Sequence, residues 1–361
     1  MTSLDIALIA AAFALILFGA EVFTNGIEWL GIKLNMSEGA TGSILAALGT
    51  ATPETLIPIV AILFTNTTDS DEIGVGAILG APFMLATLVM LLIGVTAYVL
   101  RKRRGRDTLR VDTAHATRDL SFFLVLYTVA LGLALLPKDL HFLKGYLGWI
   151  FLPAYFVYLF LVLRTPKLSP LDSEEETEER EAFDELTFAA QLRRFGLALV
   201  PTRPPLWLVL VQTFLSFGAI LIGARFFATF VEDFSHAMNF NTLLVALVLA
   251  PLATELPEAA NSLLWTKDGK DVIALGNVAG AMVFQSTIPV TIGVLLTPWE
   301  LGRFGTIAAV FALISGLLIW IQLRLRARDN ALPLSSLMLG GSLYVVFLAY
   351  VVWSVVAGLP A

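Results

Sequence analysis

The sequence predicts an all-α membrane protein with ten transmembrane helices, arranged as two inverted-topology repeats of five. The first observation is composition: 57% of the 361 residues are hydrophobic, only 14% are charged, and the mean hydropathy is +0.82. This composition lies far outside that of soluble domains. The second is a series of apolar runs, each long enough to cross a bilayer. The third is a short motif that occurs once in each half of the chain.

The apolar runs are roughly 20 residues long or longer, as spanning helices require. The segment before the first run has no basic region and no small-residue cleavage site, so we expect the first helix to be retained. The predicted helices cover residues 4–30, 37–64, 73–100, 119–137, 143–164, 206–231, 242–265, 271–297, 302–323 and 334–357. The corresponding domains are a first repeat (1–164), a cytoplasmic linker (165–205) and a second repeat (206–361).

Lys and Arg residues gather in alternate loops, which sets the predicted orientation. One side of the membrane has the cluster Arg101–Arg104 and most other basic residues, whereas the opposite side has only Lys138, Lys144 and Arg303. The basic side is expected to be cytoplasmic. Both termini then lie outside, and we place the protein in a prokaryotic plasma membrane.

The linker 165–205 contains glutamates at residues 174–176 and 178–179. We interpret it as a solvated linker with an amphipathic helix around Phe183–Phe195. The alternative is a regulatory loop that binds cations.

Several chemistries are disfavoured by what the sequence lacks. There is no Cys, which excludes disulfides and thiolate metal sites. The three His residues, His115, His141 and His236, fall outside the apolar runs and argue against a buried His-based zinc site. No phosphate-binding loop, dinucleotide fingerprint or nucleophile elbow occurs, so we expect neither an enzyme nor ATP-driven transport. We expect no cofactor and no nucleic-acid partner; the partners are inorganic cations and the lipid bilayer, and the oligomeric state is open.

An internal repeat underlies the predicted architecture. The motif T-x-x-P-E occurs at Thr50–Glu54 and again, 204 positions later, at Thr254–Glu258. The same offset relates Gly19-Ala20 to Gly223-Ala224. Because each repeat has five helices, the two copies enter the membrane in opposite directions. Such inverted repeats place their substrate sites near the bilayer midplane, on interrupted helices.

The motif residues have the chemistry of a cation site. A carboxylate within a membrane-spanning segment costs several kcal/mol unless it meets water, a cation or a partner. Thr50 and Thr254 lie one turn before Glu54 and Glu258, on the same helix face. The prolines of the motif remove backbone donors and interrupt helical hydrogen bonding, which frees carbonyl oxygens. Hard cations such as Ca²⁺ take six to eight oxygen ligands.

Glycines spaced four apart follow each motif copy, at Gly76 and Gly80 and at Gly276 and Gly280. We expect them to let the third and eighth helices approach their neighbours closely.

The paired segments resemble the two α-repeats of the cation/calcium exchanger superfamily, which includes sodium/calcium and cation/proton exchangers. The family pattern is close to G-T-S-x-P-E followed by a helix with G-N-x-x-G-S-N. This chain reads Gly49-Thr50-Ala51-Thr52-Pro53-Glu54 and Ala253-Thr254-Glu255-Leu256-Pro257-Glu258. Helix count, repeat and motif positions extend the resemblance over essentially the whole chain.

The resemblance implies that Glu54 and Glu258 are the central cation ligands, assisted by Thr50 and Thr254, and that transport proceeds by alternating access. The chain departs from the family at four positions that contribute sodium or proton sites in relatives: Ala51, Pro82, Glu255 and Met282. The counter-ion is therefore open. Glu255 adds a third acidic side chain, an extra ligand or a proton acceptor. Weaker candidates for oxygen ligands are Asn277, Gln285 and Ser286.

The leading hypothesis is a secondary-active antiporter that exchanges Ca²⁺, or a similar divalent cation, for Na⁺ or H⁺. Two negative charges bind either one divalent or two monovalent cations. Without a bound cation these charges are costly within the membrane, which disfavours the change of access in the empty protein. The alternatives are a monovalent cation/proton exchanger and a non-transporting membrane scaffold or sensor of the same fold. Glu54→Gln and Glu258→Gln separate the transporters from the scaffold.

Overall fold

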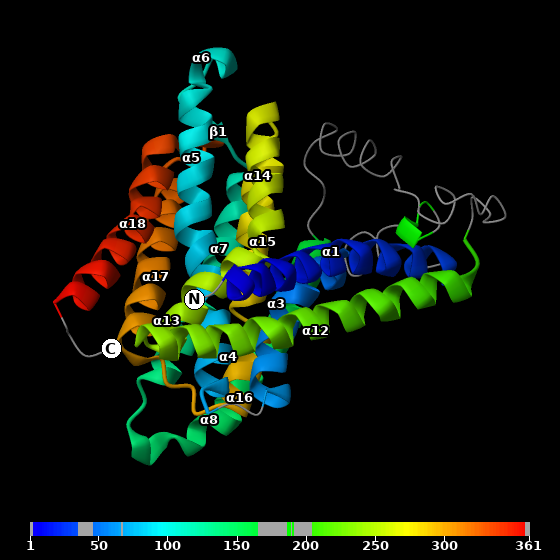
Figure 1. Cartoon of the computed structure of the whole chain (residues 1–361). Helices are drawn as coiled ribbons and strands as arrows, with labels where there is room; N and C mark the ends of the chain where they lie inside the picture. The colour runs from blue at the N-terminus through cyan, green and yellow to red at the C-terminus, as the bar shows by residue number, and fades with distance from the viewer. Residues whose placement is uncertain are drawn as a thin grey trace.

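The fold is a bundle of long helices with one small two-stranded sheet (Figure 1). The structure is a computed structural model and describes residues 3–34, 46–65, 68–164, 186–188, 190 and 204–357. The helices of the first half are α1 (Ser3–Lys33), α3 (Ala46–Phe64), α4 (Ser70–Met84), η2 (Leu85–Val89), α5 (Met90–Val99), α6 (Arg101–Arg104), α7 (Thr113–Ala134), η3 (Lys138–Leu140), α8 (Phe142–Leu147), η4 (Gly148–Ile150) and α9 (Phe151–Arg164). Those of the second half are α12 (Leu206–Met238), α13 (Thr242–Thr254), α14 (Leu256–Asp268), α15 (Asp271–Gln285), α16 (Ile288–Leu296), α17 (Gly302–Leu325) and α18 (Leu334–Val356).

Eight segments of the described chain are long and apolar enough to span a membrane, and nine if α13 and α14, which meet at a 54° bend, form one span. Many large apolar side chains on the outside of these helices are exposed, among them Phe18, Trp207 and Phe214. This surface suits a hydrocarbon solvent. The chain is therefore an integral membrane protein. The second predicted helix, 37–64, begins outside the described residues and is represented there by α3, so the count of ten stays a prediction.

Two helices that are 204 positions apart in the sequence pack against each other. α1 and α12 lie side by side across the rest of the bundle (Figure 1). A Cβ atom on Gly19 would lie 3.0 Å from Ile220, and one on Gly223 would lie 2.8 Å from Ile16. The 204-residue offset relates Gly19 to Gly223 and Ile16 to Ile220, so each contact is the repeat equivalent of the other. An inverted repeat requires this equivalence. The inverted repeat itself stays a prediction.

α4, η2 and α5 form the most buried part of the molecule. They continue as one span from Ser70 to Val99 and pack between α13, α17 and α18. A Cβ atom on Gly76 would lie 2.5 Å from the Leu243 carbonyl oxygen, and one on Gly80 would overlap the Leu247 carbonyl oxygen. The glycines of the first copy therefore allow close approach to α13, as predicted. The prediction was wrong for the second copy. Among the described residues, no atom lies within 4 Å of a Cβ atom placed on Gly276. A Cβ atom on Gly280 would have one such neighbour in the described structure, the Tyr158 hydroxyl at 3.8 Å.

This asymmetry predicts opposite outcomes for two matched substitutions. Gly80→Ala should destabilise the protein by about 1–3 kcal/mol, because the added methyl group meets a helix backbone that cannot yield without separating α4 from α13. Gly276→Ala should be neutral or slightly stabilising, since alanine favours the helix. Thermal unfolding of both variants in detergent checks this. Equal melting temperatures would show that α4 and α13 are not packed this closely.

A buried ion cluster joins the end of α6 to the start of α15. The Asp271 side chain is fully buried and accepts hydrogen bonds from Arg104 at 2.5 Å, Arg106 at 2.8 Å and the Arg110 backbone N–H at 2.9 Å. Arg110 ends strand β1 (Thr108–Arg110), which pairs antiparallel with β2 (Ala331–Pro333). The cluster and the sheet thus connect loops from both halves of the chain at one end of the bundle.

We expect Asp271→Asn to destabilise the protein by about 3–5 kcal/mol, because it leaves the Arg104 guanidinium buried without its counter-charge. Asp268→Asn is the matched control, since the Asp268 side chain is exposed three residues earlier. Melting curves recorded by tryptophan fluorescence compare the two. If Asp271→Asn has the same melting temperature as the wild type, the cluster contributes nothing to stability.

Part of the linker docks on the bundle. Leu186 is buried against Leu208 and Val209 of α12. The Thr187 N–H donates to Asn25 of α1 at 3.1 Å, and the Phe188 N–H donates to Gln212 at 2.8 Å. An apolar side chain that follows the acidic run thus attaches the linker to α1 and α12. The rest of the predicted helix around Phe183–Phe195 lies outside the described residues, apart from Ala190.

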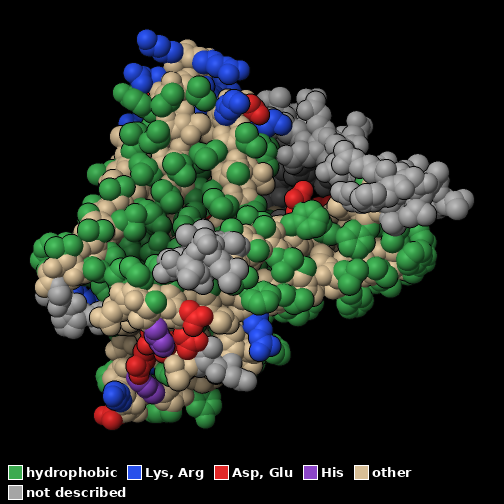
Figure 2. All heavy atoms as spheres, in the orientation of Figure 1, with side chains coloured by type: hydrophobic (Ala, Val, Ile, Leu, Met, Phe, Trp, Pro, Cys, Tyr) green, Lys and Arg blue, Asp and Glu red, His purple; other side chains and the backbone are tan. Residues whose placement is uncertain are grey.

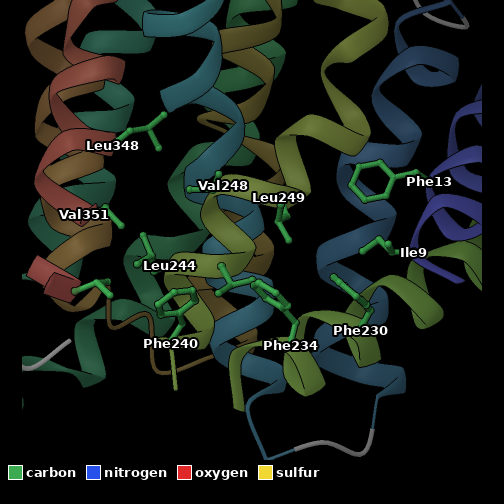
Figure 3. Close-up of a pocket in the computed structure, with 12 residues that line it drawn as sticks. Ile9, Phe13, Phe230, Phe234, Phe240, Leu244, Val248, Leu249, Leu348 and Val351 are labelled. Carbon is green, nitrogen blue, oxygen red and sulfur yellow. The ribbon is translucent and has the colours of Figure 1, made fainter. Parts of the chain in front are cut away.

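An apolar cavity of about 470 Å³ lies between α1, α12, α13 and α18 (Figure 3). Phe13, Phe230 and Phe234 line one side of it, and Leu348 and Val351 line the other. All the side chains that line the cavity are hydrocarbon, so it offers no ligand to a cation. The candidate cation site lies elsewhere.

Candidate cation site

Three carboxylates from two helical segments meet inside the bundle. Glu54 comes from α3, Glu255 from the bend between α13 and α14, and Glu258 from the first turn of α14. One oxygen of each lies within 4.8 Å of the others. Glu54 is 6% exposed, Glu255 is fully buried and Glu258 is half-buried. The structure thus brings together both glutamates of the repeated motif and the third acidic residue that the sequence singled out.

Local sequence explains the bend that positions Glu255 and Glu258. The Glu255 N–H donates to the Pro251 carbonyl at 2.8 Å, so Glu255 is the residue that caps the C-terminal end of α13. Pro257 lies in the first turn of α14, where its missing N–H is tolerated. Glu258 therefore sits at a helix N-terminus, which favours a negative charge. In the first copy the predicted interruption was wrong, because α3 continues through both Pro53 and Pro58.

Each carboxylate has an oxygen without a hydrogen-bond donor. The Oε2 atoms of Glu54, Glu255 and Glu258 are all buried and accept no hydrogen bond from the described part of the chain. At about 5 Å, two like charges repel by roughly 3 kcal/mol for an effective dielectric constant of about 20. Three such groups in a buried place require cations or protons to balance them.

Glu255 is oriented by two neutral donors. The Thr254 hydroxyl donates to Glu255 Oε1 at 3.1 Å, and the Gln285 amide donates to the same atom at 3.2 Å. Both donors hold Oε1 and leave Oε2 free. Thr254 was predicted as a cation ligand and Gln285 as a weaker candidate, and both roles stay predictions; the contacts that the structure gives these two side chains are to the Glu255 carboxylate. The pairing of Gln285 with Glu255 could not be read from the sequence, because 30 residues separate them.

The remaining predicted residues differ in their relation to the carboxylates. The Asn277 amide donates to the Glu258 carbonyl oxygen at 3.4 Å and to the Ser262 hydroxyl at 3.1 Å, so it braces the start of α14. The Ser286 hydroxyl donates to the Val283 carbonyl at 2.9 Å, within its own helical turn. The structure does not bring Ser286 into hydrogen-bond contact with the glutamates. The side chain of Thr50 lies outside the described residues.

The spacing of the carboxylates suits a hard cation. Because a Ca²⁺–oxygen distance is about 2.3–2.6 Å, oxygens that share one Ca²⁺ lie at most roughly 5 Å apart. The three carboxylate oxygens meet this condition. Neutral amide and hydroxyl groups surround them, and no basic side chain is paired with them among the described residues. The arrangement can therefore bind a cation.

Comparisons with known proteins identify the family and the fold of this chain. The family model for sodium/calcium exchanger proteins matches residues 4–164 and 208–356. The chain is 24% identical over 290 residues to CaxA of Alkalimonas amylolytica, a candidate antiporter by its name, covering 80% of each protein. It is also 24% identical over 352 residues to the inner membrane protein YrbG of Escherichia coli, covering 96% of each.

Solved structures show the same fold. The H⁺/Ca²⁺ exchanger CAX aligns with a TM-score of 0.62 at 14% identity, covering 96% of this chain and 82% of that one. The sodium-calcium exchanger NCX_Mj aligns with a TM-score of 0.53 at 18% identity, covering 97% of this chain and 99% of that one. These proteins are transporters and not enzymes. The family match spans most of the sequence, and the chain belongs to the sodium/calcium exchanger protein family.

Proposed function

We propose that the protein is a secondary-active antiporter that exchanges Ca²⁺, or a similar divalent cation, for Na⁺ or H⁺ by alternating access. The observation that carries this proposal is the convergence of three carboxylates, each with a buried and unpartnered oxygen, within 4.8 Å. Family membership supports the reaction type. The charge bias of the loops supports an orientation with both termini outside. The bacterial relatives support a prokaryotic plasma membrane.

In this proposal Glu54, Glu255 and Glu258 bind the transported cation directly. Thr254 and Gln285 hold Glu255 in place, and Asn277 supports the helix turn that carries Glu258. Thr50 supplies a hydroxyl from the equivalent position of the first copy. Three charges exceed those of one divalent ion, so a second, monovalent cation balances the site when Ca²⁺ is bound.

The surplus charge also favours one alternative, a monovalent cation/proton exchanger, because three carboxylates can bind monovalent ions without any divalent ion. Flux separates the two. Proteoliposomes that contain the purified protein are loaded with Ca²⁺. They are given an inward Na⁺ gradient in one experiment and an inward proton gradient in a second. Ca²⁺ efflux under one gradient and not the other identifies the counter-ion. If neither gradient moves Ca²⁺ while Na⁺ or K⁺ flux follows the proton gradient, the monovalent exchanger is correct.

A further inference from the structure

A second group of potential metal ligands lies far from the three glutamates, where α12 ends and α4 begins. It consists of Asp69, Glu232 and His236, which we call the rim cluster. Figure 2 shows acidic and His side chains gathered at this lower end of the molecule. One ligand atom of each residue lies within 4.8 Å of the others.

The rim cluster combines ligands from two elements. Glu232 and His236 are four residues apart on α12, so their side chains share one face of the helix. Asp69 comes from the connection before α4 and lies 2.7 Å from the His236 ring nitrogen Nε2. His236 is the only one of the three His residues with two carboxylates this close among the described residues.

Further hydrogen bonds hold the carboxylates of the cluster in place. The Thr242 hydroxyl donates to Asp69 Oδ2 at 2.7 Å and is itself 2.9 Å from the Ser235 hydroxyl. The Thr68 hydroxyl donates to Glu232 Oε1 at 3.4 Å. Outer hydrogen bonds of this kind orient the ligands of metal sites. The His236 side chain is 57% exposed, so an ion can reach the cluster directly from water.

The ligand set indicates which cation would bind. One imidazole nitrogen and two carboxylates suit Zn²⁺ and similar transition metals, whereas Ca²⁺ takes oxygen ligands only. We propose that Asp69, Glu232 and His236 form a binding site for a divalent transition metal such as Zn²⁺, separate from the transport site. A bound ion would link the end of α12 to the start of α4. This proposal does not depend on the transported ion or on transport itself.

Zn²⁺ titration of the purified full-length chain in detergent tests the proposal, with binding followed by calorimetry. The protein carries Glu54→Gln and Glu258→Gln, so that the ion does not bind at the transport site. We expect one saturable site, weakened at least about tenfold by His236→Ala. His141→Ala is the matched control and should leave binding unchanged, because the His141 ring bonds only to the Leu136 carbonyl in the described structure.

A plain ion pair between Asp69 and His236 is the competing explanation, and Glu232→Gln separates it from a metal site. This substitution keeps the ion pair and removes one metal ligand, so it should weaken Zn²⁺ binding as well, while Asp233→Asn beside it should not. Gel filtration of each variant shows whether it is folded. Absence of saturable binding, or the same Zn²⁺ affinity with and without His236 and Glu232, would overturn the proposal.

Discussion

Glu54→Gln should reduce Ca²⁺ exchange in proteoliposomes at least about a hundredfold, equivalent to about 2.8 kcal/mol of lost ion binding. The amide keeps the size and shape of the side chain but removes its charge. Glu54 is buried, and its Oε2 atom accepts no hydrogen bond from the described chain. In the proposed site a cation is the partner of this Oε2 atom. Neutralising it therefore removes an attraction that water cannot replace.

Glu258→Gln should have a similar effect, because the repeat places Glu258 at the position equivalent to Glu54. Glu72→Gln is the matched control, since Glu72 is exposed at the start of α4. Flux is compared at equal amounts of folded protein. Wild-type flux in Glu54→Gln would eliminate both the divalent and the monovalent exchanger, and would leave a scaffold or sensor of the same fold.

Much of the architecture could be predicted because hydrophobic length is a strong signal. The ten apolar runs coincide with the helical segments of the structure wherever residues are described, and the T-x-x-P-E motif led to the three glutamates. Helix ends were less accurate. The predicted sixth helix ended at residue 231, but α12 continues to Met238 and is closed by Asn239 in a left-handed conformation. Polar residues beyond the membrane give no hydropathy signal, and two of the three residues of the rim cluster, Glu232 and His236, lie on this missed segment.

Breaks within apolar runs were also invisible to hydropathy. The run 271–297 divides into α15 and α16 around Ser286 and Thr287, and the run 242–265 bends at Glu255. Prolines lie near both of these breaks, but α3 contains two prolines and is unbroken. Whether a proline interrupts a helix depends on the neighbours that satisfy the freed carbonyl, and those belong to tertiary structure.

Glu255 and Gln285 show how the site differs from the family pattern. The family has Ser where this chain has Glu255, and the donor that holds Glu255 comes from a distant helix, α15. The carboxylate and the amide lie 3.2 Å apart, so exchanging the two side chains keeps a carboxylate–amide pair between these positions. This geometry permits a test in which the charge of the site is moved and not removed.

Glu255→Gln should raise the Ca²⁺ concentration for half-maximal flux at least about tenfold, because the site loses one of three charges. Gln285→Glu should also impair transport, since it adds a fourth carboxylate within hydrogen-bond distance of Glu255. The double variant Glu255→Gln/Gln285→Glu restores three carboxylates and one carboxylate–amide pair. We expect it to recover most of the lost affinity, with a coupling energy of roughly 0.5–3 kcal/mol. Flux measured against Ca²⁺ concentration for all four proteins gives this energy. Simple additivity of the two single effects would mean that Glu255 and Gln285 act independently. An unchanged Ca²⁺ dependence in Glu255→Gln would mean that the third charge is not part of the cation site.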